Sequence, residues 1–127
     1  MAKFGTRIVE DIKGREPVEE LVINGFGAFE ILENELIGST YINEMDSMKA
    51  YIQHLANGGN AGRRLKLIKG GRSGLTEYEF IGSHLRVYGI QQPGKKLIIF
   101  GGKKKKADSS DNIADFQNLL EQYQKSL

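Results

Sequence analysis

The stretch "TEYEFIGSHLRVYGI", residues 76–90, decides the fold. Acidic and apolar residues alternate from Glu77 to Phe80, and a second alternating run begins at Leu85, beyond the dipeptide Gly82-Ser83. A period of two is typical of β-strands that bury one face. Because Gly-Ser suits a two-residue turn, the stretch predicts an antiparallel hairpin.

A loop made only of Gly82 and Ser83 sets the register of this hairpin. The predicted cross-strand pairs are Phe80 with Leu85 and Tyr78 with Val87 on the buried face, and Glu79 with Arg86 and Glu77 with Tyr88 on the other face. Glu79 and Arg86 then form either an ordinary cross-strand ion pair or part of a site.

Neighbouring segments extend the sheet. We expect short strands at residues 7–12, 65–68 and 96–100, the last after the turn "QQPGKK". Asn24-Gly25 lies between two apolar runs and is a strong signal for a hairpin turn.

Two segments have a helical period. In the first, the apolar stripe follows a capping Ser39 or Thr40 and ends at Asn57-Gly58-Gly59. Its members are Tyr41, Met45, Met48, Ile52 and Leu55. In the second, Ser110 or Asp111 is the cap, and the stripe consists of Ile113, Phe116, Leu120, Tyr123 and Leu127. The order predicts one small α+β domain, residues 1–127, in which a helix covers one sheet face and leaves the other free for function.

The composition of the 127 residues fits a single cytoplasmic domain. No apolar run approaches the roughly 20 residues that cross a bilayer, and the N-terminus has no signal-peptide pattern. The chain has no cysteine, and its two histidines, His54 and His84, are far apart. We therefore expect neither a metal site nor a cofactor.

The formal net charge of +2 conceals three unequal segments. Residues 1–60 carry a local charge of −5, residues 61–106 carry +10 and residues 107–127 carry −3. A basic middle is the pattern expected of a surface that meets a polyanion. Solvated strand edges, where lysine discourages aggregation, are the alternative.

Two basic segments are candidates for such a surface. The glycine-rich "GGNAGRRLKLIKGGRSG", residues 58–74, is either a clamp on phosphates or an ordinary surface loop. The run "GGKKKKAD", residues 101–108, places four ammonium groups together, which favours an anion that relieves their repulsion. The candidate RNA-binding residues are Arg63, Arg64, Lys66, Lys69, Arg72, Lys103, Lys105 and Lys106.

The segment from about Phe29 to Tyr123 resembles the RelE/ParE superfamily of bacterial toxins, in particular its HigB-like, phage-derived branch. The features that carry the resemblance are "LKLIKG" at 65–70, "EYEFIGSHLRVYGI" at 77–90, "KLIIFGGKKKK" at 96–106 and the closing helix. The resemblance implies a twisted antiparallel sheet of RelE type over residues 28–127. Residues 1–27 fall outside it and are expected to be an N-terminal extension.

Many members of the superfamily cut messenger RNA in the ribosomal A site, with basic residues around the scissile phosphate. The resemblance places Arg86 and either Lys103 or Lys104 at such positions. Cleavage by the 2′-hydroxyl also needs a base and an acid, for which Glu79 and then Tyr88 or His84 are the candidates. The candidate catalytic residues are therefore Arg86, Lys104, Glu79 and Tyr88. The chain departs from the family in having Glu77 and Glu79 before the turn, and Ala107 to Ser110 where some members carry a catalytic Tyr or His.

Three hypotheses follow. The first is the toxin of a type II toxin–antitoxin pair, a ribosome-dependent mRNA endonuclease neutralised by an antitoxin of helix-turn-helix type. The second is a non-catalytic nucleic-acid or protein-binding module on the same scaffold; members of the superfamily that target gyrase share the architecture. The third is a structural protein whose lysines confer solubility only.

Overall fold

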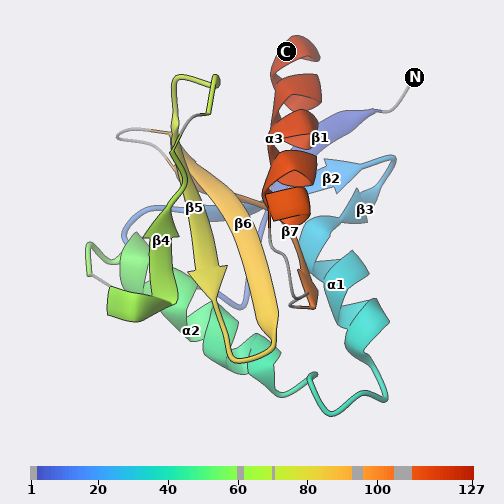
Figure 1. Ribbon diagram of the computed structural model, residues 1–127, viewed down its shortest axis with the longest axis vertical. Coiled ribbons are helices and arrows are strands. Elements are labelled where there is room, and N and C mark those ends of the chain that lie inside the picture. The colour runs from blue at the N-terminus through green and yellow to red at the C-terminus, as the bar shows by residue number, and fades with distance from the viewer. Residues whose placement is uncertain (1–2, 60–61, 70, 93–95, 105–109) are drawn as a thin grey trace.

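The computed structural model describes residues 3–59, 62–69, 71–92, 96–104 and 110–127, without the side chains of residues 104, 110 and 111. Within these ranges the fold is α+β, with three α-helices and one seven-stranded sheet (Figure 1). The elements are β1 (Phe4–Ile8), β2 (Val18–Ile23), β3 (Phe26–Gly27), α1 (Ala28–Leu36), α2 (Glu44–Ala56), the 3₁₀ turn η1 (Gly62–Arg64), β4 (Leu65–Leu67), β5 (Thr76–Ile81), β6 (Leu85–Gln92), β7 (Lys96–Lys104) and α3 (Ser110–Lys125).

The sheet is mixed, with the order β1-β2-β7-β6-β5-β4 and with β3 paired to β2. Strands β4 to β7 form an antiparallel meander, as predicted, but β2 runs parallel to β7. Residues 4–27, expected as an extension, supply β1, β2 and β3 to this same sheet. The buried Val18 and Leu21 of β2 belong to the two hydrophobic clusters that lie on opposite faces of the sheet.

The hairpin of β5 and β6 has the predicted strands and faces, but its register is displaced by two residues. Gly82 N donates to Leu85 O at 2.9 Å, so the two turn residues are Ser83 and His84 rather than Gly82 and Ser83. The observed pairs are Phe80 with Val87, Tyr78 with Gly89, Glu79 with Tyr88 and Glu77 with Ile90. Because side chains alternate with a period of two, a shift of two keeps every residue on its predicted face.

The predicted turn at Asn24-Gly25 is confirmed, with Ile23 paired to Phe26 across it. Both turn residues have positive φ, 52° for Asn24 and 88° for Gly25, as a tight hairpin turn requires. The second apolar run, however, is only briefly a strand, because it continues as helix α1. The residues that α1 buries are Ala28, Phe29, Leu32 and Leu36, which share one side of a helix.

The predicted stripe on α2 is confirmed in its centre, since Met45, Met48 and Ile52 are buried. The predicted cap is wrong: the helix begins at Glu44 after Asn43, and Ser39 Oγ instead accepts from the backbone N–H of Tyr41 at 2.9 Å. Asn57 and Gly58 end the helix, and Gly58 has a φ of 83° that favours glycine.

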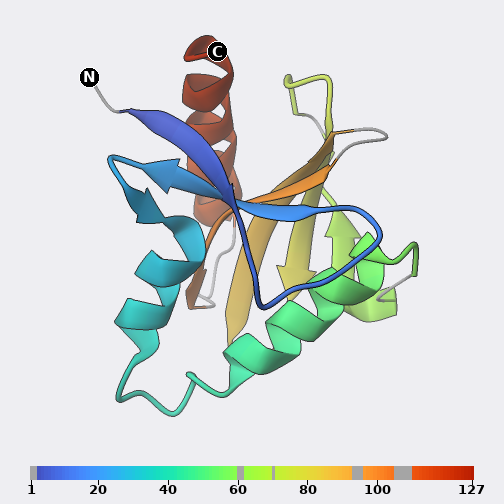
Figure 2. The same ribbon diagram turned by 180° about the vertical axis from the view of Figure 1, so that it is seen from behind.

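Helices cover both faces of the sheet. Residues of α1 and α2 pack with the β5–β6–β7 side chains of one face, and α3 packs on the other (Figure 1 and Figure 2). On the α3 face, Phe116 stacks on Tyr88 at 5.5 Å and meets Phe100 edge-on at 5.7 Å, measured between ring centroids. The expectation of one open sheet face is therefore wrong, because α3 covers part of it.

Candidate functional site

Arg86 and Lys103 are neighbours at the hairpin end of the α3 face. They are direct register partners across β6 and β7, so their Cβ atoms lie about 5 Å apart. Arg86 is half-buried and Lys103 is exposed. Near its end, β7 therefore brings Lys103, the first residue of the lysine run, beside the candidate arginine.

Arg86 is held in place by one nitrogen of its guanidinium group, Nη1. Nη1 donates to the backbone oxygen of Gly82 at 2.6 Å and to that of Leu85 at 2.9 Å. No described residue accepts a hydrogen bond from its Nε or Nη2. These two nitrogens form one edge of the planar group, an arrangement that matches two oxygens of a phosphate.

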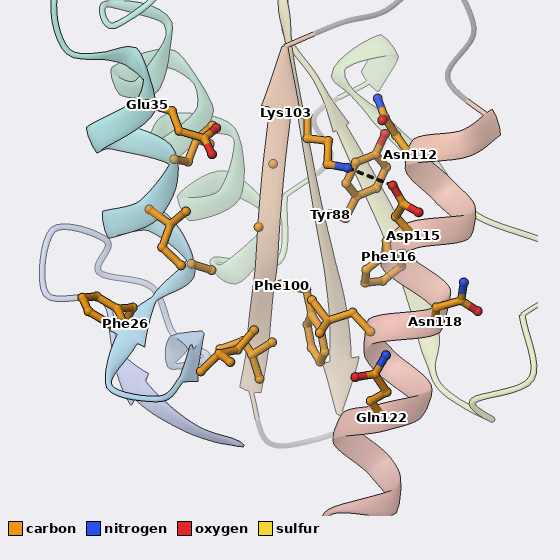
Figure 3. Close-up of a pocket in the computed structure, with 18 residues that line it drawn as sticks. Phe26, Glu35, Tyr88, Phe100, Lys103, Asn112, Asp115, Phe116, Asn118 and Gln122 are labelled. Carbon is orange, nitrogen blue, oxygen red and sulfur yellow. Dashed lines mark hydrogen bonds and ion pairs between the residues drawn. The ribbon is translucent and has the colours of Figure 1, made fainter. Parts of the chain in front are cut away.

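Lys103 forms an ion pair with Asp115 of α3, with 2.9 Å between Nζ and Oδ2 (Figure 3). Both side chains are largely exposed, so water and salt screen the attraction and the pair contributes at most about 1 kcal/mol. Lys104 occupies the next register position, opposite Leu85, so Lys103 rather than Lys104 is the partner of Arg86. Lys105 and Lys106 lie outside the described residues.

Glu79 and Tyr88, the predicted base and acid, are bonded to each other. The Tyr88 hydroxyl donates to Glu79 Oε2 at 2.9 Å, and each residue is only 3% exposed. The predicted pairing of Glu79 with Arg86 is wrong, since Arg86 lies opposite Ile81. Burial, reinforced by the Glu79 carboxylate, raises the pKa of Tyr88 far above its usual range. The phenol stays protonated at neutral pH, and neither group reaches solvent in this structure.

His84, the other candidate acid, is engaged elsewhere. Its Nδ1 lies 2.8 Å from Glu44 Oε2, and its ring stacks on Tyr41 with centroids 4.7 Å apart. His84 occupies the second position of the turn, so it links the hairpin to α2.

The remaining predicted cations lie at or near the opposite edge of the sheet. Arg63 and Arg64 form η1, and the guanidinium carbon of Arg64 lies 5.7 Å from the centroid of the Tyr51 ring. Lys66 is opposite Glu79 on β4. Three strand spacings, about 14 Å, separate β4 from β7, so these cations form a second cluster rather than a continuation of the first. Lys69 and Arg72 follow β4 and are exposed.

Two residues of the site were not among the sequence candidates. Asp115 joins the site because α3 folds over β7, which no local pattern indicates. Asn112, one turn earlier on α3, is 2% exposed, and among the described residues no group meets its Nδ2 with the geometry of a hydrogen bond. A buried unpartnered amide is uncommon and costly, but in the sequence it is an ordinary helix residue.

The described residues offer no group of three or more His, Asp or Glu placed to hold a metal ion. Within the same ranges, no helix has the length and apolar character needed to cross a membrane. Comparison with protein-family models, with curated protein sequences and with solved structures gives no match to this chain.

We expect Tyr88→Phe to lower the free energy of unfolding by about 1–3 kcal/mol, because it leaves the buried Glu79 carboxylate without its donor. Tyr51→Phe, at a half-buried ring on α2, is the matched control and should change stability by less than about 0.5 kcal/mol. Urea unfolding measures both. Equal effects of the two substitutions would contradict the structural role given to the Tyr88 hydroxyl.

The hydrogen bond between Tyr88 and Glu79 also predicts that the stability of the protein depends on pH. The pKa of Tyr88 is higher in the folded chain than in the unfolded chain. The contribution of the Tyr88 hydroxyl to the free energy of unfolding is therefore complete below the unfolded pKa of about 10, and it is lost as the pH rises above that value. The stability difference between wild type and Tyr88→Phe should therefore shrink above about pH 10.

Proposed function

We propose that this protein is an RNA-directed toxin of the RelE/ParE type, a cytoplasmic mRNA endonuclease that acts on the ribosome and is neutralised by an antitoxin. The observation that carries the proposal is the Arg86–Lys103 pair. A guanidinium group whose Nε and Nη2 donate to no described residue lies beside an exposed ammonium group on one face of the sheet. This arrangement suits a phosphate of the RNA backbone.

The order of the elements also supports the proposal. Two helices, an antiparallel meander and a closing helix follow one another from α1 to α3, the part of the chain that the resemblance covers. This is compatible with the sheet that the resemblance implies, and the motifs "LRVYGI" and "KLIIFGGKKKK" form the adjacent strands β6 and β7. The chain adds β1 and places β2 parallel to β7.

The pair supplies charge stabilisation rather than proton transfer. In cleavage by the 2′-hydroxyl, that group gives its proton to water and its oxygen forms a bond to phosphorus, while the bond from phosphorus to the 5′ oxygen breaks and the 5′ oxygen takes a proton from water. The phosphate gains negative charge on the way. Arg86 would hold two phosphate oxygens, and Lys103 would add a point charge after exchanging Asp115 for the phosphate. Glu79 and Tyr88 keep the floor of the site in place from beneath α3.

Expression of the chain alone tests this proposal. We expect induction to stop growth of a bacterial culture within a few generations, because translated messages are cut. Co-expression of a helix-turn-helix protein encoded in the neighbouring frame should restore growth. Undiminished growth of cells that accumulate the folded chain would contradict the toxin function.

A second candidate is favoured by the burial of Glu79 and Tyr88 and by the absence of another acid–base pair beside Arg86 among the described side chains. It is an RNA-binding module without cleavage on the same scaffold. It predicts salt-sensitive RNA binding with intact transcripts, so mapping of RNA ends separates it from the first candidate.

A further inference from the structure

Strand β1 forms an open edge of the sheet. It comes first in the strand order, beyond β2, and β2 is the only described strand that pairs with it (Figure 1). The outer side of such a strand presents backbone N–H and C=O groups with which another strand can pair. At the opposite end of the sheet, β4 has three residues against five in β1, so β1 offers the longer open edge.

The hydrogen bonds to β2 determine which backbone groups of β1 point outward. Asn24 N donates to Lys3 O at 2.9 Å, so the backbone groups of Lys3 face β2. Val9 N donates to Val18 O, also at 2.9 Å, so Val9 faces β2 as well. In an antiparallel pair this orientation alternates along the strand. The residues whose backbone groups point away from β2 are therefore Phe4, Thr6 and Ile8.

The side chains of these three residues share one face of the sheet, because side chains alternate with a period of two. Phe4 meets Tyr123 of α3 edge-on, with 6.5 Å between ring centroids, so this is the α3 face. Ile8 is 63% exposed, although it is a large hydrophobic residue. Proteins usually protect an open edge with charged residues or proline, so an exposed isoleucine at this position indicates an edge that another chain covers.

The open edge of β1 is complementary to itself in the antiparallel direction. If a twofold axis passes beside Thr6, Phe4 of one copy lies opposite Ile8 of the other, and outward groups meet outward groups in every pair. Each Phe4 then covers an Ile8 of the other copy. On the other face, Arg7 lies opposite Gly5, where there is room for it: apart from its chain neighbours, no described atom lies within 4 Å of the position that a Cβ of Gly5 would take.

We propose that β1 is the interface of a homodimer, in which two copies pair antiparallel about Thr6 and join their sheets into one. The twofold axis uses the same edge of both copies, so the assembly is closed there. The remaining edges are the two β4 strands, which are short and carry the exposed Lys66 in their centre, a residue type that discourages further pairing. The proposal is independent of the proposed function, because β2 and β7 separate β1 from Arg86 on β6.

Other occupants fit this edge less well. Glu19 and Glu20 of β2 lie opposite Ile8 and Arg7, and these carboxylates repel the phosphates of RNA. A strand of a different protein would have to supply a large apolar residue opposite Ile8 and a small residue opposite Arg7. A second copy of this chain supplies both, in Phe4 and Gly5.

Sedimentation equilibrium of the full-length chain tests the proposal. We expect a species of twice the chain mass of 14.2 kDa, in a monomer–dimer equilibrium. Ile8→Arg places a charge opposite Phe4 of the other copy and should raise the dissociation constant by about tenfold or more. Ile37→Arg is the matched control and should leave the dissociation constant unchanged, because Ile37 is 70% exposed but lies at the end of α1.

Cysteine cross-linking tests the register, because the chain has no cysteine of its own. Thr6→Cys places two thiols at the twofold axis, where opposed Cα atoms are about 5.5 Å apart, within the span of a disulfide. Ile8→Cys places the two thiols about 14 Å apart, at a position that is more exposed than Thr6. We expect Thr6→Cys to cross-link on oxidation about tenfold faster than Ile8→Cys, and a mixture of Phe4→Cys with Ile8→Cys to form mixed dimers.

Three results would overturn the proposal. A wild-type chain that stays monomeric up to about 1 mM would leave the open edge to another partner. Self-association that Ile8→Arg does not weaken would place the contact on a different surface. Cross-linking of Ile8→Cys as fast as that of Thr6→Cys would show parallel pairing or chance collision in place of the antiparallel register.

Discussion

Arg86→Ala is expected to abolish the growth arrest that the wild-type chain causes. The substitution removes the guanidinium edge formed by Nε and Nη2 and leaves Lys103 as the one described cation at that corner of the sheet. A hydrogen-bonded charge contact is worth about 1.5–3 kcal/mol, which corresponds to a loss of roughly tenfold to a hundredfold in RNA affinity. If the arginine also stabilises the transition state, the cleavage rate falls by a further factor of about 10²–10³. Colony counts after induction measure the effect.

Three control variants separate the site from the fold. Lys103→Ala removes an exposed side chain and should weaken the arrest while changing the free energy of unfolding by at most about 1 kcal/mol. Lys125→Ala removes a more exposed lysine near the end of α3, where it pairs with Glu121 at 3.0 Å, and should leave the arrest unchanged. Arg86→Lys keeps the charge but not the two-nitrogen edge, so it should restore the arrest only in part. A fully toxic and folded Arg86→Ala variant would show that the guanidinium is not needed.

Phe116→Ala is expected to lower the free energy of unfolding by about 3–5 kcal/mol, a large share of the roughly 5–15 kcal/mol typical of a domain. Phe116 is buried and contacts Tyr88 and Phe100, so its loss leaves a cavity where α3 meets the sheet. Because α3 is the element that covers Glu79 and Tyr88, the substitution should also make this face more accessible to hydrogen exchange.

Phe26→Ala is the matched control for this experiment. It deletes the same atoms from a side chain that is already 61% exposed, and should cost less than about 1 kcal/mol. Thermal or urea unfolding of the two variants compares them directly. Similar losses at Phe26 and Phe116 would contradict the packing of α3 described above.

Local sequence patterns predict much of this fold. The alternation in residues 76–90 assigns the correct faces, because a two-residue error in the turn does not change the parity of a strand. The cross-strand partners of β5 and β6 cannot be predicted from the alternation alone. Gly82-Ser83 and Ser83-His84 are both acceptable turns, and packing of His84 against Tyr41 and Glu44 accompanies the second.

Tertiary packing decides the parts that the sequence leaves open. The segment from Ala28 to Leu36 has apolar residues that suit either a strand or a helix, and its burial against β7 accompanies the helical form. The cover that α3 places over Glu79 and Tyr88 depends on contacts more than 20 residues apart in the chain. The sequence therefore identifies Arg86 and the lysine run as candidates, whereas only the structure shows that Lys103 is the register partner and that Asp115 lies beside it.

Mapping of RNA 5′ ends in cells that express wild type or Arg86→Ala measures the central claim most directly. With wild type, we expect new ends within translated codons, at positions that a ribosome would place in its A site, and we expect their loss with Arg86→Ala. Transcripts that remain intact while the folded wild-type chain accumulates would contradict RNA cleavage at the Arg86–Lys103 pair.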